Sequence, residues 1–356
     1  MTLELSEEQQ DLSSSLRASL SRTAAGEDVW PALLEMGLTE IPFPEHVGGA
    51  GFALKDTAVV MSELGRSLGR APYFSSVILA GLTLLHAGSD AACGQYLPSI
   101  ADGTATAALV TGFPFGTSLV TAREGADDTV VLDGAQEAVV DGSDADVLFV
   151  VADGSDGPHL AAIDAHADGV TRTRRETLDF TRGLTRVEFS DAVAHRVTGR
   201  DLPTGLTTAQ AVAITALAAE QVGAARACLE MSVEYAKTRR QFGRAIGSFQ
   251  AIKHRLTDML IAIELAEAAV LDAAGADTRR TSEFLVAAAT ARVLASRAAT
   301  FAAEESIQIH GGIGFTWEHP LHQYFRRAKT SELLLGSTTV HVEAVAAALV
   351  HDRNRY

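Results

Sequence analysis

The sequence predicts an α+β protein with an N-terminal helical domain, a small central antiparallel β domain and a C-terminal helical bundle. Apolar residues recur at helical spacing before residue 108 and again after residue 204. Between these regions, short β-branched segments are punctuated by Gly and Asp, which is typical of an antiparallel sheet or barrel. The 356 residues suffice for two or three domains with cores of their own. We therefore expect domains at 1–108, 109–203 and 204–356.

In the first domain, a helix is expected to begin just after Ser6. The Ser6 hydroxyl can accept a hydrogen bond from the first turn, and Glu7 and Glu8 suit the positive end of the helix dipole. A later helix is predicted over residues 59–68, where Val and Leu recur at helical spacing. Residues 44–52 (PEHVGGAGF) lie between these helices. Their three glycines predict a loop that turns tightly or lets another backbone approach.

Two different periodicities predict the strands and the later helices. Short β-branched runs predict strands within residues 129–142, 146–153, 159–165 and 185–191. Beyond residue 205, apolar stripes with helical spacing begin at Ile214, Ile252 and Phe284. Long helices joined by short connections imply an antiparallel bundle.

Composition argues against several classes of function. Lys and Arg number 29 and Asp and Glu number 45, so the net charge of −16 disfavours a broad basic face for nucleic acid. Cys93 and Cys228 lie far apart without metal-ligand spacing, so we expect neither a disulfide framework nor a metal site. The N-terminus does not resemble a signal peptide, and no apolar stretch is expected to reach the length of a membrane span. We therefore predict a cytoplasmic protein without nucleic-acid or membrane partners.

Two segments carry the residues with the most chemical interest, 236–259 (AKTRRQFGRAIGSFQAIKHRLTDM) and 307–329 (IQIHGGIGFTWEHPLHQYFRRAK). The arginines of the first segment form a basic cluster at a helix end. Such a cluster is either a solvated face or an anion site, because Arg can contact phosphate through two hydrogen bonds. The pair Gly311–Gly312 is either a helix C-cap or a place where the backbone passes close to a ligand.

Together, these two segments resemble the signatures of the acyl-CoA dehydrogenase family. PEHVGGAG (44–51), SELGRSLG (62–69) and the order of the domains resemble that family as well. The resemblance implies a C-terminal four-helix bundle and FAD-dependent α,β-dehydrogenation of an acyl-CoA thioester. In this reaction a carboxylate removes the α-proton while a hydride leaves the β-carbon for the flavin. Electron-transfer flavoprotein is the electron acceptor that the resemblance implies.

The resemblance also implies an FAD that lies across a subunit interface. One subunit holds the flavin ring and the substrate, and its neighbour holds the ADP portion. By this match, the residues of this chain that contact the ADP portion are Arg239, Gln241, Phe242, Gln308, His310, Gly311 and Gly312.

The sequence departs from the family pattern where the catalytic base is expected. The glutamate position of the family falls on Leu335, which cannot abstract a proton. In some members the base lies on the first helix of the bundle, and those positions fall on Ala213 and Ile214. We therefore predict no catalytic residue in this chain. Glu220 and Glu332 are the two candidates for a substitute base, although structural roles are the simpler interpretation for both.

The flavin-ring site departs from the pattern too. The family's T-E-P-x-x-G-S-D loop corresponds to residues 111–120 (TGFPFGTSLV), which contain neither an acid nor the Ser-Asp pair. The family's W-I-T-N segment corresponds to residues 138–141 (AVVD). An aromatic wall and a hydroxyl donor for the flavin are therefore missing.

These losses affect one half of the shared site and spare the other. The pattern resembles the non-catalytic subunit of the heterotetrameric acyl-CoA dehydrogenases of bacterial steroid side-chain degradation. It implies an α2β2 assembly with two FADs, in which a paralogous partner subunit carries the catalytic Glu and most of the acyl-CoA site. The implied substrate is a steroid side-chain CoA ester. Two alternatives stay open: a complete homomeric dehydrogenase that uses Glu220 or Glu332, and a non-enzymatic acyl-CoA-binding or scaffold relative.

Overall fold

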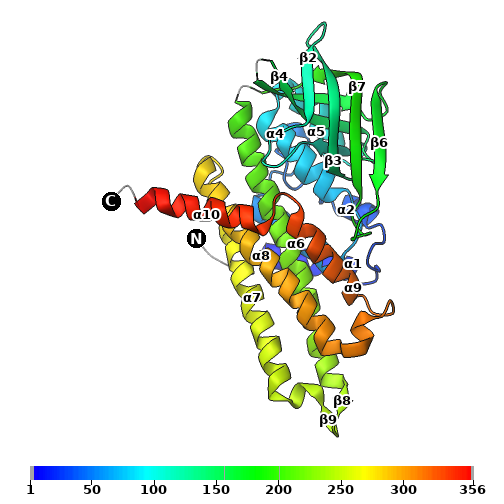
Figure 1. Cartoon of the computed structure of the whole chain (residues 1–356), viewed down its shortest axis with the longest axis vertical. Helices are drawn as coiled ribbons and strands as arrows, with labels where there is room; N and C mark the ends of the chain where they lie inside the picture. Colours follow the sequence, from blue (N-terminus) through cyan, green and yellow to red (C-terminus); the bar gives the residue numbers. More distant parts are fainter. Residues whose placement is uncertain (1–3, 156, 200, 354–356) are drawn as a thin grey trace.

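The computed structural model describes residues 4–353 except 156 and 200. A small barrel of strands lies at one end of the molecule, and a long helical bundle extends from it to the opposite end (Figure 1). The N-terminal helices pack beside the upper part of the bundle (Figure 1). The predicted α+β class is therefore confirmed.

The N-terminal region is helical, as predicted. Ser6 caps the first helix in a reciprocal capping box with Gln9. The loop over residues 44–52 contains one short 3-10 helix, and Gly48 and Gly51 adopt positive φ in it. The elements are α1 (Glu7–Leu20), α2 (Trp30–Glu35), η1 (Glu45–Val47), α3 (Leu54–Ser67), the π-helix η2 (Tyr73–Gly81), α4 (Leu82–Ala87) and α5 (Asp90–Ala101).

Helix α3 crosses the first bundle helix, α6 (Leu202–Thr238), at very close range. A Cβ atom at Gly65 would lie 1.9 Å from the Glu220 carbonyl oxygen, and one at Gly223 would lie 1.8 Å from the Ser62 carbonyl oxygen. Only glycine therefore fits at either position. The crossing joins the N-terminal helices and the bundle into one continuous hydrophobic core.

The strands form a closed barrel with a separate core. The pairings β4–β5, β5–β7, β7–β3, β3–β2 and β2–β4 complete a ring, and β1 and β6 add to its sides. The predicted antiparallel β domain is present, with two parallel pairings that were not predicted, those of β1 and β2 with β4. The strands are β1 (Ala107–Val110), β2 (Val120–Glu124), β3 (Thr129–Val140), β4 (Val147–Gly154), β5 (Gly157–Asp164), β6 (Val170–Arg175) and β7 (Leu184–Arg196).

The bundle ends in a small hairpin at the point farthest from the barrel (Figure 1). Helix α10 projects sideways from the body (Figure 1). After α6, the elements are β8 (Arg240–Gln241), β9 (Arg244–Ala245), the 3-10 helix η3 (Ile246–Ser248), α7 (Gln250–Ala274), α8 (Thr281–His310), the 3-10 helix η4 (Gly311–Phe315), α9 (Leu321–Leu333) and α10 (Thr338–Arg353).

The expectation about apolar stretches needs a correction. Helix α6 and the segment Thr281–Phe315 are long and apolar enough to cross a membrane by length and composition alone. Burial explains their composition, since 94% of the apolar window of α6 and 56% of that in the second segment lie inside the folded chain. A helix that is surrounded by others is apolar on every side.

Candidate functional site

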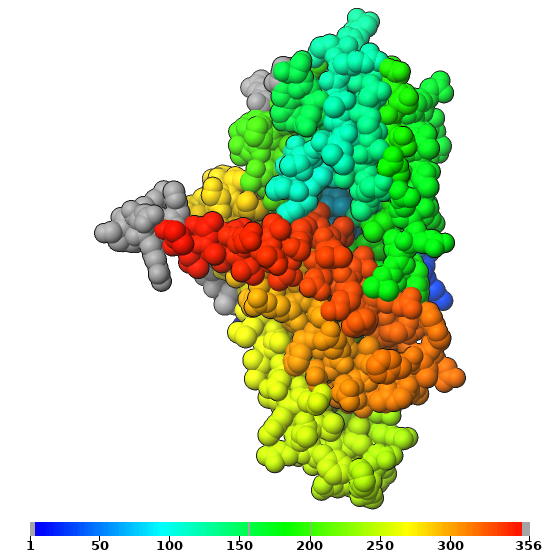
Figure 2. Space-filling view, viewed as in Figure 1, coloured from blue at the N-terminus to red at the C-terminus, as the bar shows by residue number. Residues whose placement is uncertain are grey.

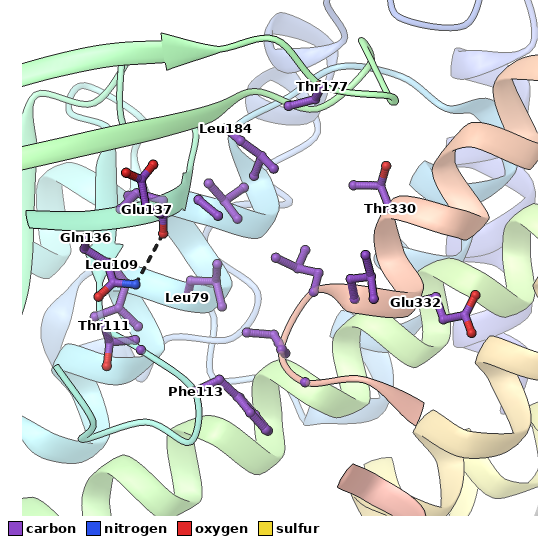
Figure 3. Close-up of a pocket in the computed structure, with 18 of the residues that line it drawn as sticks. Leu79, Leu109, Thr111, Phe113, Gln136, Glu137, Thr177, Leu184, Thr330 and Glu332 are labelled. Atoms are coloured by element: carbon purple, nitrogen blue, oxygen red, sulfur yellow. Dashed lines mark hydrogen bonds between the residues drawn. The ribbon is translucent and has the colours of Figure 1, made fainter. Parts of the chain in front are cut away.

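A cavity of about 730 Å³ lies between the barrel and the turn that joins α9 to α10 (Figure 3). In Figure 2 a hollow is visible at this place, between the strands above and the red-orange end of the chain below. Its walls come from η2, β1, β3, β7 and α9, and they are mostly apolar. Cavities of this size and character are typical of small-molecule sites.

The structure brings the three divergent segments together around this cavity. Phe113 comes from the segment 111–120, Val139 and Val140 from the segment 138–141, and Leu335 from the position of the family base. A β-bulge between Gln136 and Val139 interrupts the register with β7 at this point. The barrel and the bundle thus meet at this site. Apolar residues stand there at the positions where an acid, an aromatic side chain and a hydroxyl group were expected.

Asp141 is the one acid in the segment 138–141, and it does not line the cavity. Its carboxylate accepts hydrogen bonds from the Ser75 hydroxyl at 2.7 Å and from the Gly183 N–H at 3.2 Å. Burial raises the pKa of Asp141, and these hydrogen bonds offset only part of that effect. Asp141 therefore anchors the barrel to η2 and does not replace a flavin-contacting residue.

The turn at Leu335 keeps a fixed backbone although its side chain is inert. Leu335 and Gly336 both have positive φ, at 57° and 88°. Arg292, which is fully buried, donates to the Ser331 carbonyl oxygen and, at 3.1 Å, to the Leu334 carbonyl oxygen. His341 Nε2 lies 2.8 Å from the Leu335 carbonyl oxygen. Burial lowers the pKa of Arg292 to about 10.

Glu220 belongs to a buried ion cluster that sequence reasoning did not foresee. Arg182 donates to both carboxylate oxygens of Glu220 at 2.6 and 2.7 Å, and Arg327 also pairs with Glu220. Arg327 Nε donates to Asp179 Oδ2 at 2.5 Å. All four side chains are at most 6% exposed. The cluster fastens the loop between β6 and β7 to α6 and α9.

Both carboxylates of this cluster are held ionised. Burial alone raises the pKa of Glu220, but the charges of Arg182 and Arg327 outweigh burial and bring the pKa below its usual value. Burial raises the pKa of Asp179 as well, but the charge of Arg327 and further contacts outweigh burial, so this pKa also lies below its usual value. A carboxylate held ionised by two guanidinium groups is a poor proton acceptor, which argues for a structural role of Glu220.

These lowered pKa values predict an acid-dependent loss of stability. The contribution of a carboxylate whose folded pKa is depressed is complete above its unfolded pKa of about 4 and disappears as the pH falls through the folded pKa. We expect the urea unfolding free energy to fall steeply below about pH 4, and less steeply in Glu220→Gln. Urea titrations at pH 7, 5, 4 and 3 measure this. Identical pH slopes for the two proteins would contradict the role given to Glu220.

The other positions considered for a base do not supply one. Ala213 and Ile214 are fully buried in the core of the bundle. Glu332 lines the cavity, but in Figure 3 its carboxylate points away from the cavity centre. It lies 3.8 Å from Lys329 Nζ and its side chain is 38% exposed. Sequence reasoning had favoured structural roles for both Glu220 and Glu332, and this geometry agrees.

The residues matched to the ADP portion lie in a different part of the molecule. Arg239 directly precedes the β8–β9 hairpin, which contains Gln241, and Phe242 lies at the hairpin turn with 91% exposure. In the described chain, no ion pair or side-chain hydrogen bond engages Arg239. The nearby Arg244 stacks on Phe249, at 3.9 Å from the ring centroid. The hairpin is therefore an exposed basic and aromatic tip.

The Gly-Gly turn follows α8 on the same half of the bundle. Gln308, Gly311 and Gly312 are exposed, and a Cβ at either glycine would meet nothing within 4 Å. The His310 side chain is buried, with its Nδ1 2.8 Å from the Ser306 carbonyl oxygen and its ring stacked 4.3 Å from that of Tyr235. Because Tyr235 lies one turn before Arg239, this stack links the two predicted segments.

Two family models match the chain. The acyl-CoA dehydrogenase N-terminal domain matches residues 7–104, and the acyl-CoA dehydrogenase C-terminal domain matches residues 211–350. The chain therefore belongs to the acyl-CoA dehydrogenase family, a family of FAD-dependent oxidoreductases. The resemblance drawn from the sequence motifs is confirmed.

Individual relatives agree with this assignment. Acyl-CoA dehydrogenase IpdE2 of Mycobacterium tuberculosis is 40% identical over 315 residues, which cover 87% of this chain and 83% of the relative. Two solved structures each superpose with a TM-score of 0.86 at 28% identity, covering 98% of this chain and 99% of theirs. One is a variant of the Tcur3481-Tcur3483 steroid ACAD, and the other is the ChsE4-ChsE5 complex from Mycobacterium tuberculosis.

Proposed function

We propose that the chain is the non-catalytic subunit of a heteromeric FAD-dependent acyl-CoA dehydrogenase, which introduces an α,β-double bond into an acyl-CoA thioester. A paralogous partner subunit carries the catalytic Glu and most of the acyl-CoA site. One observation carries this proposal: the cavity at Leu335 has no unpaired carboxylate among its described lining residues.

The exposed tip fits the diphosphate part of an FAD. The guanidinium of Arg239 is available for two charge-assisted hydrogen bonds to phosphate. The open space around Gly311 and Gly312 leaves their backbone accessible to a ligand. The exposed ring of Phe242 offers a flat apolar surface. Gln241 and Gln308 add exposed amide groups, and His310 contributes only through its backbone, because its ring is buried. FAD, when bound, supplies the hydride acceptor of the reaction.

The chain's own cavity does not fit the flavin ring. Ala138, Val139 and Val140 line the wall where the family has an aromatic side chain and a hydroxyl donor. Strand β3, which lines the cavity, and the β8–β9 tip also lie far apart within one chain (Figure 1). These features support an FAD that is shared with the partner, with its ADP portion on this chain and its ring on the partner.

The names of related structures suggest the assembly and the substrate. ChsE4-ChsE5 is described as a complex, and Tcur3481-Tcur3483 is described as a steroid ACAD. By analogy, we propose that this chain forms an α2β2 assembly with its partner and that the assembly binds two FADs. The proposed substrate is a steroid side-chain CoA ester. Another similar chain, at 25% identity and a TM-score of 0.87, belongs to a structure that is described as an electron transferring flavoprotein of Acidaminococcus fermentans. Electron-transfer flavoprotein is accordingly the proposed acceptor of the complex.

Restoring the missing carboxylate tests whether only the base is lacking. We expect Leu335→Glu, purified alone with added FAD, to turn over no acyl-CoA beyond the wild-type background, because the flavin-ring contacts are absent too. Reduction of an artificial electron acceptor measures turnover. The matched control is Leu335→Gln, which has nearly the same shape without the charge. Robust turnover by the Glu variant alone would favour a homomeric enzyme and overturn the proposal.

A further inference from the structure

Three neighbouring aromatic rings join the two segments that are proposed to hold the ADP portion of FAD. The Tyr235 ring on α6 lies 4.3 Å from the ring of His310, the last residue of α8, at an angle of only 23°. The ring of His319, two residues before α9, lies 4.5 Å from that of His310. Ring contacts at these distances stabilise a structure beyond the area that they bury. This ring stack therefore ties the ends of α6 and α8 to the start of α9.

Hydrogen bonds fix the orientation of both imidazoles. His310 Nδ1 lies 2.8 Å from the Ser306 carbonyl oxygen, and this nitrogen carries the proton because a carbonyl oxygen only accepts. His319 Nδ1 accepts from the N–H of Leu321, the first residue of α9, at 3.4 Å. Burial lowers the pKa of both histidines, and the nearby His310 and His322 lower that of His319 further. Both imidazoles are therefore neutral at about pH 7.5 and contact each other without repulsion.

Each end of the contact between Tyr235 and His310 leads directly to a residue of the proposed FAD site. The Arg239 N–H donates to the Tyr235 carbonyl oxygen at 2.8 Å, at the end of α6. His310 is followed at once by Gly311, whose φ of 61° is a conformation that residues with a side chain rarely adopt. A shift of either ring therefore moves the backbone of a residue that the ADP portion would contact.

The contact between His310 and His319 also closes the loop of residues 311–318, which contains the Gly-Gly turn. The large apolar side chains of this loop are exposed by 40%, 78% and 73%, at Ile313, Phe315 and Trp317 respectively. The loop thus gains little stability from burial in the core. The contact between the two rings that flank it is therefore an important constraint on the position of Gly311 and Gly312.

We infer that the ring stack of Tyr235, His310 and His319 positions the residues that bind FAD. It holds Arg239 and the Gly311–Gly312 backbone at the spacing that one diphosphate group requires. A site that is ordered before its ligand arrives loses less free energy on binding. The rings need not touch FAD themselves. The inference rests on the proposed function, because it takes the ADP portion of FAD as the ligand.

Removing one ring tests the inference in the reconstituted complex after its FAD has been stripped. At about pH 7.5, we expect Tyr235→Leu to weaken FAD binding about 10-fold, the effect of losing one hydrogen bond to a charged phosphate. His319→Leu removes the ring at the other end of the stack and should act in the same direction. Tyr235→Phe keeps the ring and should retain the affinity of the wild type. Quenching of FAD fluorescence measures each dissociation constant.

A double-mutant cycle with Arg239→Ala separates positioning from general destabilisation. If the Tyr235 ring acts through Arg239, then Tyr235→Leu should weaken FAD binding only slightly once Arg239 is absent. A purely structural role would give the same 10-fold loss in both backgrounds. Urea unfolding of each variant shows that the chain is folded under the conditions of the titration.

Three results would each overturn the inference: normal FAD affinity in Tyr235→Leu, an equal loss in Tyr235→Phe, or the same loss with and without Arg239. The single variant Arg239→Ala reports the proposed function. If it binds FAD as tightly as the wild type, the proposed function is wrong at that residue and the inference falls with it. A failure confined to the ring variants refutes only the positioning role.

Discussion

Replacing Glu220 with Ala should destabilise the protein by about 3–5 kcal/mol, the usual cost of breaking a buried ion pair by removing one partner. The substitution leaves two buried guanidinium groups, Arg182 and Arg327, with Asp179 as the remaining carboxylate of the cluster. It also releases the loop between β6 and β7 from α6. Urea unfolding of the protein, monitored by circular dichroism, measures the change in unfolding free energy.

The matched control is Glu332→Ala, which removes the same side chain from a partly exposed pair with Lys329. Exposed pairs contribute about 0–1 kcal/mol, so this variant should unfold almost like the wild type. A Glu220→Ala variant with normal stability but no turnover in the complex would contradict the structural role of Glu220, because that combination identifies a catalytic base.

Replacing Arg239 with Ala should weaken FAD retention by the complex about 10- to 100-fold. The substitution removes hydrogen bonds to a charged group, which contribute about 1.5–3 kcal/mol. Stability should change little, because Arg239 is exposed and has no side-chain partner in the described chain. Flavin absorbance after gel filtration, together with an FAD titration of the stripped complex, measures the effect.

Arg279→Ala provides the control for the loss of one positive charge. Arg279 lies in the turn after α7, at the end of that helix opposite the β8–β9 tip, and its side chain is 88% exposed. This variant should retain FAD normally. If Arg239→Ala also retained FAD normally, the shared-site model would be wrong at that residue.

Much of the fold follows from local sequence patterns. The capping box at Ser6, the glycine loop at 44–52 and the long bundle helices are local or periodic features, so one sequence suffices to predict them. The parallel pairing of β1 with β4 was missed because β1 has only four residues, all of them buried, and buried runs show no alternation.

The candidate site was predictable only in part. Family motifs located the exposed tip and the missing base, because both depend on residue identity at fixed positions. The cluster of Asp179, Arg182, Glu220 and Arg327 was not predictable, since it joins three segments far apart in the sequence, the β6–β7 loop, α6 and α9. The ring stack of Tyr235, His310 and His319 likewise depends on side-chain packing that no periodicity reveals.

Flavin content and native mass, determined for this chain alone and after co-expression with a paralogous subunit, test the central claim most directly. The account predicts a colourless chain alone and a yellow α2β2 complex with two FADs when the paralogue is present. One FAD per chain in the protein purified alone, together with turnover of an acyl-CoA, would contradict it.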